Sequence, residues 1–191
     1  MGIEWGNFPR DAAAYVKDAR LPGPIFNNWD CGGYLLWAWN GKPLPFLDGR
    51  LGATQKLQDH DAIVDATGPA ETIEKYGFRT ILFQPLYYNS GRIVPAVYYF
   101  LSHAEWRLVW AGDALVFAKR GDTAVRELDP SAAWSAILKQ SRARVQLHDD
   151  APHLLYTQGI ALFQLGLWDE GRRMFQQAQQ SHPELKEQYP L

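Results

Sequence analysis

The sequence of 191 residues contains a single cysteine, so no disulfide can form within the chain. No run of about 18 apolar residues occurs, which excludes a membrane-spanning helix within these residues. Lysine and arginine do not cluster and the formal net charge is −2, so we expect no nucleic-acid partner. Glycine-rich phosphate loops and cysteine or histidine pairs at zinc spacing are also missing. We therefore expect neither a cofactor nor a metal site.

Apolar and aromatic side chains, by contrast, are abundant. Hydrophobic residues make up 47% of the chain and aromatic residues 14%, including eight tryptophans, which supports a folded core. Helical patterns alternate with short apolar runs, of which FRTILFQP (residues 78–85) is the clearest strand and KPLPFLDG (42–49) a shorter one. Gly112-Asp113 predicts a hairpin. The pattern indicates an α/β fold with a three-layer mixed sheet, mostly parallel, ending in an antiparallel hairpin.

The composition changes after Gly121, which predicts an α/β domain over residues 1–121 and a helical tail over residues 129–191. Asp129 and Pro130 are typical of a helix start. Residues 152–185 resemble one tetratricopeptide repeat, although Gln158 stands where a leucine is usual. The positions in register are Leu155, Gly159, Leu162, Trp168, Gly171, Phe175, Ala178 and Pro183. The resemblance implies a surface for protein contacts, and one repeat needs neighbours to bury its faces.

The stretch FNNWDCGGYLLWAW (26–39) is the most unusual part of the sequence. We interpret it as a strand-to-helix turn, with Asp30 as the helix cap and two glycines that allow a sharp bend. The same geometry suits a ligand, because α/β proteins bind ligands at such turns. The candidate ligand-binding residues are Trp29, Asp30, Gly32, Gly33, Asp48 and Arg50. Whether Asp30 caps its helix or faces a ligand stays open at this point.

Catalytic chemistry has little support in the sequence, and we assign no catalytic residue. Cys31 follows a strand and precedes a helix, but no histidine lies at a spacing that indicates a base for it. Asp59-His60-Asp61 diverge on a helix, so we interpret them as a solvated face rather than a metal site. The segment from Tyr87 to Arg92 predicts an exposed loop that could contact a carbohydrate or a peptide.

Over residues 8–119 the order of motifs resembles the soluble domain of some bacterial polytopic glycosyltransferases that use lipid-linked sugars. The turn Trp29–Tyr34, the strand end Asp48-Gly49-Arg50, the Tyr76-Gly77 strand entry and the Trp106–Phe117 hairpin carry this resemblance. More distantly, Trp29, Asp30 and Gly32 match the Trp-Trp-Asp-Tyr-Gly motif of oligosaccharyltransferases, which binds an acceptor peptide, but the first Trp and the Tyr are missing.

The resemblance implies a non-catalytic accessory domain on the extracytoplasmic side of a membrane protein. Its partners would be another protein or the remainder of the parent, with a peptide or glycan as ligand. Two alternatives stay open: a free-standing adaptor, which would suit the cytoplasm, and a small enzyme with its site at Asp30–Gly33 and Asp48–Arg50.

Overall fold

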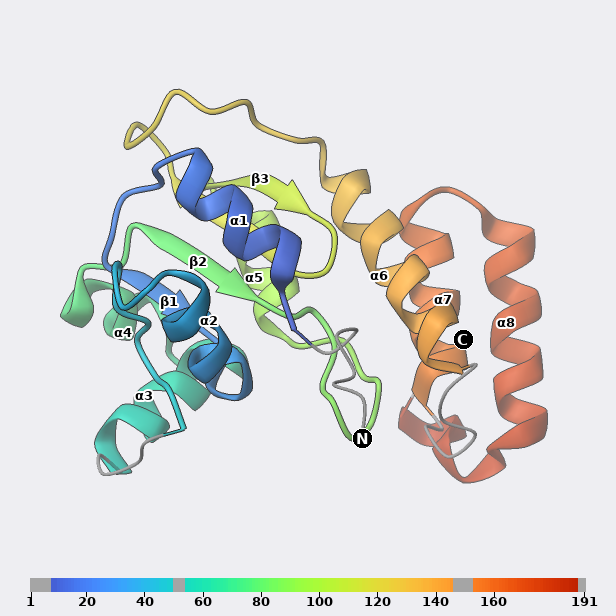
Figure 1. The fold of residues 1–191 in the computed structure, drawn as a ribbon. Helices are drawn as coiled ribbons and strands as arrows, with labels where there is room; N and C mark the ends of the chain where they lie inside the picture. The colour runs from blue at the N-terminus through green and yellow to red at the C-terminus, as the bar shows by residue number, and fades with distance from the viewer. Residues whose placement is uncertain (1–7, 50–53, 146–152, 189–191) are drawn as a thin grey trace. The chain divides into compact units, whose positions relative to one another are not determined.

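The computed structural model describes residues 8–49, 54–145 and 153–188 (Figure 1). The chain folds into two compact units. The α/β unit holds the residues up to Pro85 and Val94–Asp129, and the helical unit holds Leu86–Ile93 and the residues from Pro130 onward. Because the first unit combines helices with a mixed four-stranded sheet, the predicted α/β class is confirmed.

The sheet has the strand order β1-β2-β4-β3, with β1 at Ile25–Asn27, β2 at Thr80–Phe83, β3 at Trp106–Ala111 and β4 at Leu115–Lys119. β1 and β2 are parallel, as expected for the early strands, and β3 and β4 form the expected antiparallel hairpin. β4 also pairs antiparallel with β2. Among the described strands two of the three pairings are therefore antiparallel, so the expectation of a mostly parallel sheet is wrong.

The strand predicted over residues 42–49 does not form, which leaves the sheet with fewer parallel pairings. This segment touches the sheet through one isolated bridge, between Ile25 and Pro45. Pro43 and Pro45 lack the N–H groups that a strand needs for its ladder. The side chain of Asn27 supplies the missing bonds instead: its amide oxygen accepts from Phe46 N at 2.7 Å and its amide nitrogen donates to Leu47 O at 2.8 Å.

Among the residues that the structure describes, the α-helices of the α/β unit are α1 (Arg10–Asp18), α2 (Gly32–Ala38), α3 (Thr54–Val64), α4 (Pro69–Tyr76) and α5 (Ala96–Ser102). Side chains alternate along the strands, so the two faces of the sheet have different partners. Leu82 and Val116 belong to the cluster formed with α1 and α2. Phe83 and Phe117 instead pack on Phe100 of α5, with ring centroids 5.9 and 5.4 Å from it.

Helix α1 is capped from the hairpin between β3 and β4. Asp113 Oδ2 accepts from Asp11 N at 2.6 Å and Asp113 Oδ1 accepts from Ala12 N at 3.0 Å. The residue before α1 is Pro9, which makes no side-chain cap bond. Asp113 therefore satisfies the free amides of the first turn of α1 and adds a negative charge at the positive end of the helix.

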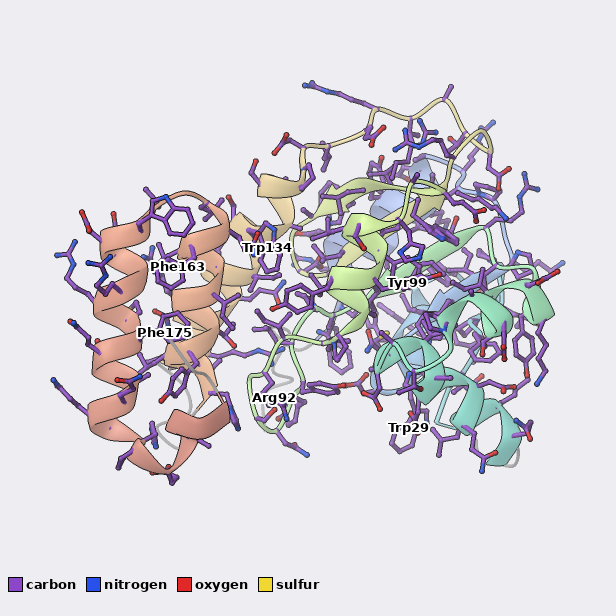
Figure 2. All side chains as sticks on the ribbon, turned by 180° about the vertical axis from the view of Figure 1, so that it is seen from behind. Trp29, Arg92, Tyr99, Trp134, Phe163 and Phe175 are labelled. Atoms are coloured by element: carbon purple, nitrogen blue, oxygen red, sulfur yellow. The ribbon has the colours of Figure 1, made fainter. Side chains whose placement is uncertain are left out.

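The helical unit contains α6 (Pro130–Val145), α7 (His153–Gln164), α8 (Trp168–Ser181) and a 3-10 segment, Pro183–Gln188. Its buried cluster consists of Tyr156, Phe175, Ala178 and Leu185. Phe163 and Phe175 stack at 5.2 Å between α7 and α8 (Figure 2). A side chain at Gly159 would lie 2.6 Å from the Phe175 ring and 3.3 Å from Gly171 O, so the two helices cross where both residues are glycine.

The segment Leu86–Ile93 packs within the helical unit, although it follows β2 in the sequence. Thr157 Oγ1 donates to Gly91 O at 2.8 Å, and the Arg144 guanidinium donates to Tyr87 O at 3.2 Å. Gly91 has φ +72 and lies against the Leu154 side chain, so only glycine fits there. The predicted loop is thus partly exposed, at Tyr88 and Asn89, and partly buried, at Gly91.

Candidate functional site

The candidate site is the corner where β1 runs into α2, which we call the β1–α2 corner (residues 27–37 with 46–49). A 3-10 turn, Trp29–Cys31, joins the strand to the helix. Because β1 and β2 are parallel, the corner lies at the same sheet edge as Gln84, the residue that follows β2. This is the edge at which ligands bind in parallel α/β sheets.

Asp30 does not cap α2, which corrects the sequence-based expectation. Neither the 3-10 turn nor α2 has a side-chain cap bond, and the residue before α2 is Cys31. The 3-10 turn places Asp30 inside a helical conformation, whereas a capping residue must stand before the helix with extended backbone. Asp30 is instead exposed at the surface of the corner.

Two asparagines that the sequence analysis overlooked hold the corner together. Asn27 is fully buried and binds the 46–47 backbone, and its Nδ2 also donates to Asn28 O at 2.7 Å. Asn28 Oδ1 accepts from Gln84 N at 2.6 Å, which ties the end of β1 to the end of β2. A pair of amides directly after the apolar residues Ile25 and Phe26 was the signal in the sequence, because buried amides need specific partners.

The two adjacent glycines have different environments. Gly32 is buried, and a side chain there would overlap the carbonyl oxygen of Leu47. Gly33 is exposed, and a side chain there would meet nothing within 4 Å. Gly32 therefore allows the close approach of the 47–48 backbone to α2, whereas Gly33 leaves an open patch on the surface of the helix.

Cys31 is buried and its thiol donates to Asn28 O at 3.2 Å. Burial raises the pKa of this thiol, and the neighbouring Asp30 charge raises it further. A nucleophilic cysteine needs the opposite shift, toward the thiolate at neutral pH. The described environment thus makes Cys31 a structural residue of the turn.

The Asp59-His60-Asp61 segment of α3 is not the solvated face that we expected, because Asp59 and His60 are buried. Asp59 Oδ2 accepts from the Lys75 ammonium and from the Tyr76 hydroxyl, both at 2.6 Å. These bonds lower the pKa of Asp59 to about 2. His60 stacks on Phe26 with centroids 5.5 Å apart and reaches the corner itself: Trp29 N donates to its Nε2 at 3.2 Å.

The outward face of the corner consists of aromatic and acidic residues. Trp29 and Trp37 are 42% and 70% exposed, and Figure 2 shows Trp29 at the surface of the α/β unit. Asp30 is also exposed and Asp48 is half-buried. Arg50 lies outside the described residues, so its role as a candidate ligand-binding residue stays a prediction. The corner thus presents large rings and carboxylates, while its amides and its thiol point inward.

The predicted contact residues of the tail have a clear division between core and surface. The buried ones are Gly159, Leu162, Gly171, Phe175 and Ala178, while Leu155 is half-buried and Trp168 and Pro183 are exposed. Trp168 packs against Phe163 with ring centroids 5.5 Å apart and remains 62% exposed. Most of these residues therefore join α7 to α8, and Trp168 is the large side chain among them that faces solvent.

In the described parts of the chain, no group of three or more His, Cys, Asp or Glu residues could hold a metal ion. Across those same residues, none of the helices has both the length and the apolar character needed to cross a bilayer. Scans against protein-family models, curated proteins and solved structures produced no match to this chain.

Proposed function

We propose that the chain is a non-catalytic binding domain of a membrane glycosyltransferase-like protein. It would combine a three-layer α/β body with a tetratricopeptide-like hairpin that contacts protein partners. In this proposal the domain works on the extracytoplasmic side, and the β1–α2 corner meets a peptide, a glycan or the remainder of the parent protein. Sugar transfer itself would be performed elsewhere in the parent.

The observation that carries the proposal is that the polar side chains of the corner are bonded within the fold, whereas its large aromatic side chains are exposed. The polar side chains that could take part in a reaction make structural hydrogen bonds instead. Asn27 and Asn28 bond backbone groups, the Cys31 thiol bonds a carbonyl, and His60 bonds an amide. Its outward groups are Trp29 and Trp37, which suit contact rather than reaction. Exposed aromatic residues are typical of recognition surfaces, because they offer large contact areas at a small cost in side-chain entropy.

Two measurements test the proposal separately. The coding region upstream of this chain should encode several membrane-spanning helices, and their absence would refute membership of a membrane glycosyltransferase. For the binding role, a photo-crosslinking amino acid at Trp37 in the full-length protein should capture a neighbour in intact cells. The same group at Tyr98, an aromatic residue of α5 that is 42% exposed, is the matched control. Equal capture from both positions would contradict a contact role for the corner.

A free-standing adaptor is the second candidate, and the crossing of α7 and α8 at Gly159 and Gly171 favours it. A tetratricopeptide-like hairpin needs such a close crossing of its two helices. A photo-crosslinker at Trp168 distinguishes the two candidates. If the chain is an adaptor, this residue should capture a separate protein, and the capture should not depend on the β1–α2 corner.

An enzyme at the corner is the least supported reading, and Cys31 gives a direct test. Because the chain has one cysteine, thiol labelling has a single readout. We expect iodoacetamide at neutral pH to leave the folded chain unlabelled and to label it in denaturant, since the thiol is buried with a raised pKa. Rapid labelling of the folded chain would revive the hypothesis of a nucleophilic cysteine.

A further inference from the structure

The ring of His60 joins α3 to the turn that carries Trp29, and it does so in one protonation state. The Trp29 N–H can only donate, so His60 Nε2 must accept, and the ring proton then lies on Nδ1. Nδ1 faces Asp61 Oδ1 at 2.9 Å, which is an acceptor. One neutral tautomer of the ring therefore satisfies both contacts at once.

A second proton on the ring is incompatible with the first of these contacts. It would place an N–H on Nε2 opposite the Trp29 N–H, across a distance that is now 3.2 Å. The Nδ1–H bond to the Asp61 carboxylate would become an ion pair and would be stronger. His60 is 7% exposed and stacks on Phe26, so the ring has little room to turn away. The contact with Trp29 is therefore the one that must break.

The surroundings of the ring direct the movement to the turn. The titratable side chains on the 3-10 turn, α3 and α4, besides His60 itself, are Asp30, Cys31, Lys56, Asp59, Asp61, Glu71, Glu74, Lys75 and Tyr76, and Asp48 lies in the neighbouring 46–49 segment. Asp61 is the partner of Nδ1, while Asp59 is held by Lys75. On the strand side, Asn28 is fixed to Gln84. The 3-10 turn has the exposed residues Trp29 and Asp30, so a shift of this turn meets solvent on its outer side.

We infer that His60 is a pH-sensitive latch: its protonation releases the Trp29 amide and rearranges the exposed Trp29–Asp30 face of the β1–α2 corner. While the ring is neutral, the corner is closed on His60. Once the ring is protonated, the turn opens, and any ligand that contacts Trp29 meets a different surface.

NMR of the full chain between pH 7.5 and 5 tests the latch. The chemical shifts of the His60 ring carbons should change with pH, and the Trp29 amide shift should change over the same range. The hydrogen exchange of this amide, corrected for its intrinsic pH dependence, should accelerate about five- to tenfold, which corresponds to one lost hydrogen bond. His60→Gln keeps an acceptor for the Trp29 amide but cannot be protonated, so the pH response at Trp29 should disappear. His103→Gln, which alters an exposed histidine of the same unit, is the matched control and should keep the response.

Three results would overturn the inference. The first is a His60 ring that stays neutral down to pH 5. The second is a ring that titrates while the Trp29 amide does not respond. The third is a Trp29 response that survives in His60→Gln. None of these results bears on whether the corner binds a ligand, so the latch and the proposed function can fail independently.

Discussion

Asn27 shows how one side chain can replace a short strand. Its amide group has a donor and an acceptor side by side, as a peptide group has, and it uses them on Leu47 O and Phe46 N. The 45–47 segment therefore stays at the edge of β1 without a regular ladder. A polar side chain with no exposed surface is stable here because each of its atoms is hydrogen-bonded.

We expect Asn27→Ala to lower the free energy of unfolding by about 2 kcal/mol, because it leaves half-buried backbone groups at residues 46 and 47 without their Asn27 partner. Urea unfolding of the full chain measures this change. Asn89→Ala, at an exposed asparagine, is the control and should change the free energy by less than about 0.5 kcal/mol. A similarly small effect for Asn27→Ala would show that the hydrogen bonds from Asn27 to residues 46 and 47 are not needed for stability.

The Asp59 carboxylate gives the protein a predictable response to acid. Its bonds to Lys75 and Tyr76 lower its folded pKa to about 2, below the ordinary pKa of an aspartate. A carboxyl with a lowered folded pKa stabilises the fold above its unfolded pKa, and this contribution is lost as the pH falls through the folded pKa. The urea midpoint should therefore decrease between pH 4 and pH 2 in part because of Asp59.

Asp59→Asn should lower stability at pH 7 and flatten the pH dependence between pH 4 and 2. The exposed Asp18→Asn is the matched control. If both variants follow the wild-type curve between pH 4 and 2, the contact of Asp59 with Lys75 and Tyr76 does not contribute to acid unfolding.

At the scale of elements, the adjacent glycines of α2 allow a matched experiment. Gly32→Ala should destabilise the protein by at least about 2 kcal/mol, because the new methyl group would overlap Leu47 O and force the backbone apart. Gly33→Ala faces open space and should be neutral or stabilising by up to about 1 kcal/mol, since alanine is the better helix former. Equal effects of the two substitutions on thermal unfolding would contradict the described packing of α2 on residues 47–48.

Elements whose signals are local could be predicted from the sequence. The run Phe78–Phe83 indicated β2, and Gly112-Asp113 indicated the hairpin of β3 and β4. The turn at residues 28–33 was also located correctly as a strand-to-helix junction. These features depend on neighbouring residues, such as an apolar run or a turn dipeptide, and the sequence displays them directly.

What the sequence could not reveal depends on residues far apart in the chain. The burial of His60 follows from its contact with Trp29, 31 residues earlier. The 46–47 backbone is held by the side chain of Asn27, about 20 residues earlier, and Asp30 loses its capping role because the turn begins one residue before it, at Trp29. Periodicity on one helix gave no indication of which polar residues would find such partners.

For the whole molecule, the important point is that the helical unit consists of two separate stretches of chain. Leu86–Ile93 contributes Gly91 and Tyr87 to contacts with α7 and α6. A fragment that begins at Asp129 lacks this stretch. Removal of the α/β part therefore also removes a piece of the helical unit.

We expect the fragment 129–191 to be less stable in its helices than the intact chain by roughly 2–3 kcal/mol, because it loses two hydrogen bonds and the contact of Leu154 with Gly91. Hydrogen exchange of α7 in urea, measured in the fragment and in the full chain, gives the comparison. Thr157→Val in the full chain removes one of these bonds and should produce a smaller change in the same direction. Identical protection of α7 in fragment and full chain would show that Leu86–Ile93 is not needed.

The Asp113 cap of α1 also sets an order of events during synthesis. The backbone amide of Asp11 donates to the carboxylate of Asp113, which lies 102 residues later in the chain. At about 5–20 residues per second on the ribosome, this carboxylate is made roughly 5–20 s after the helix that it caps. Helix α1 is thus completed only when the β3–β4 hairpin has formed, and until then a nascent chain carries an α1 whose first turn lacks this cap.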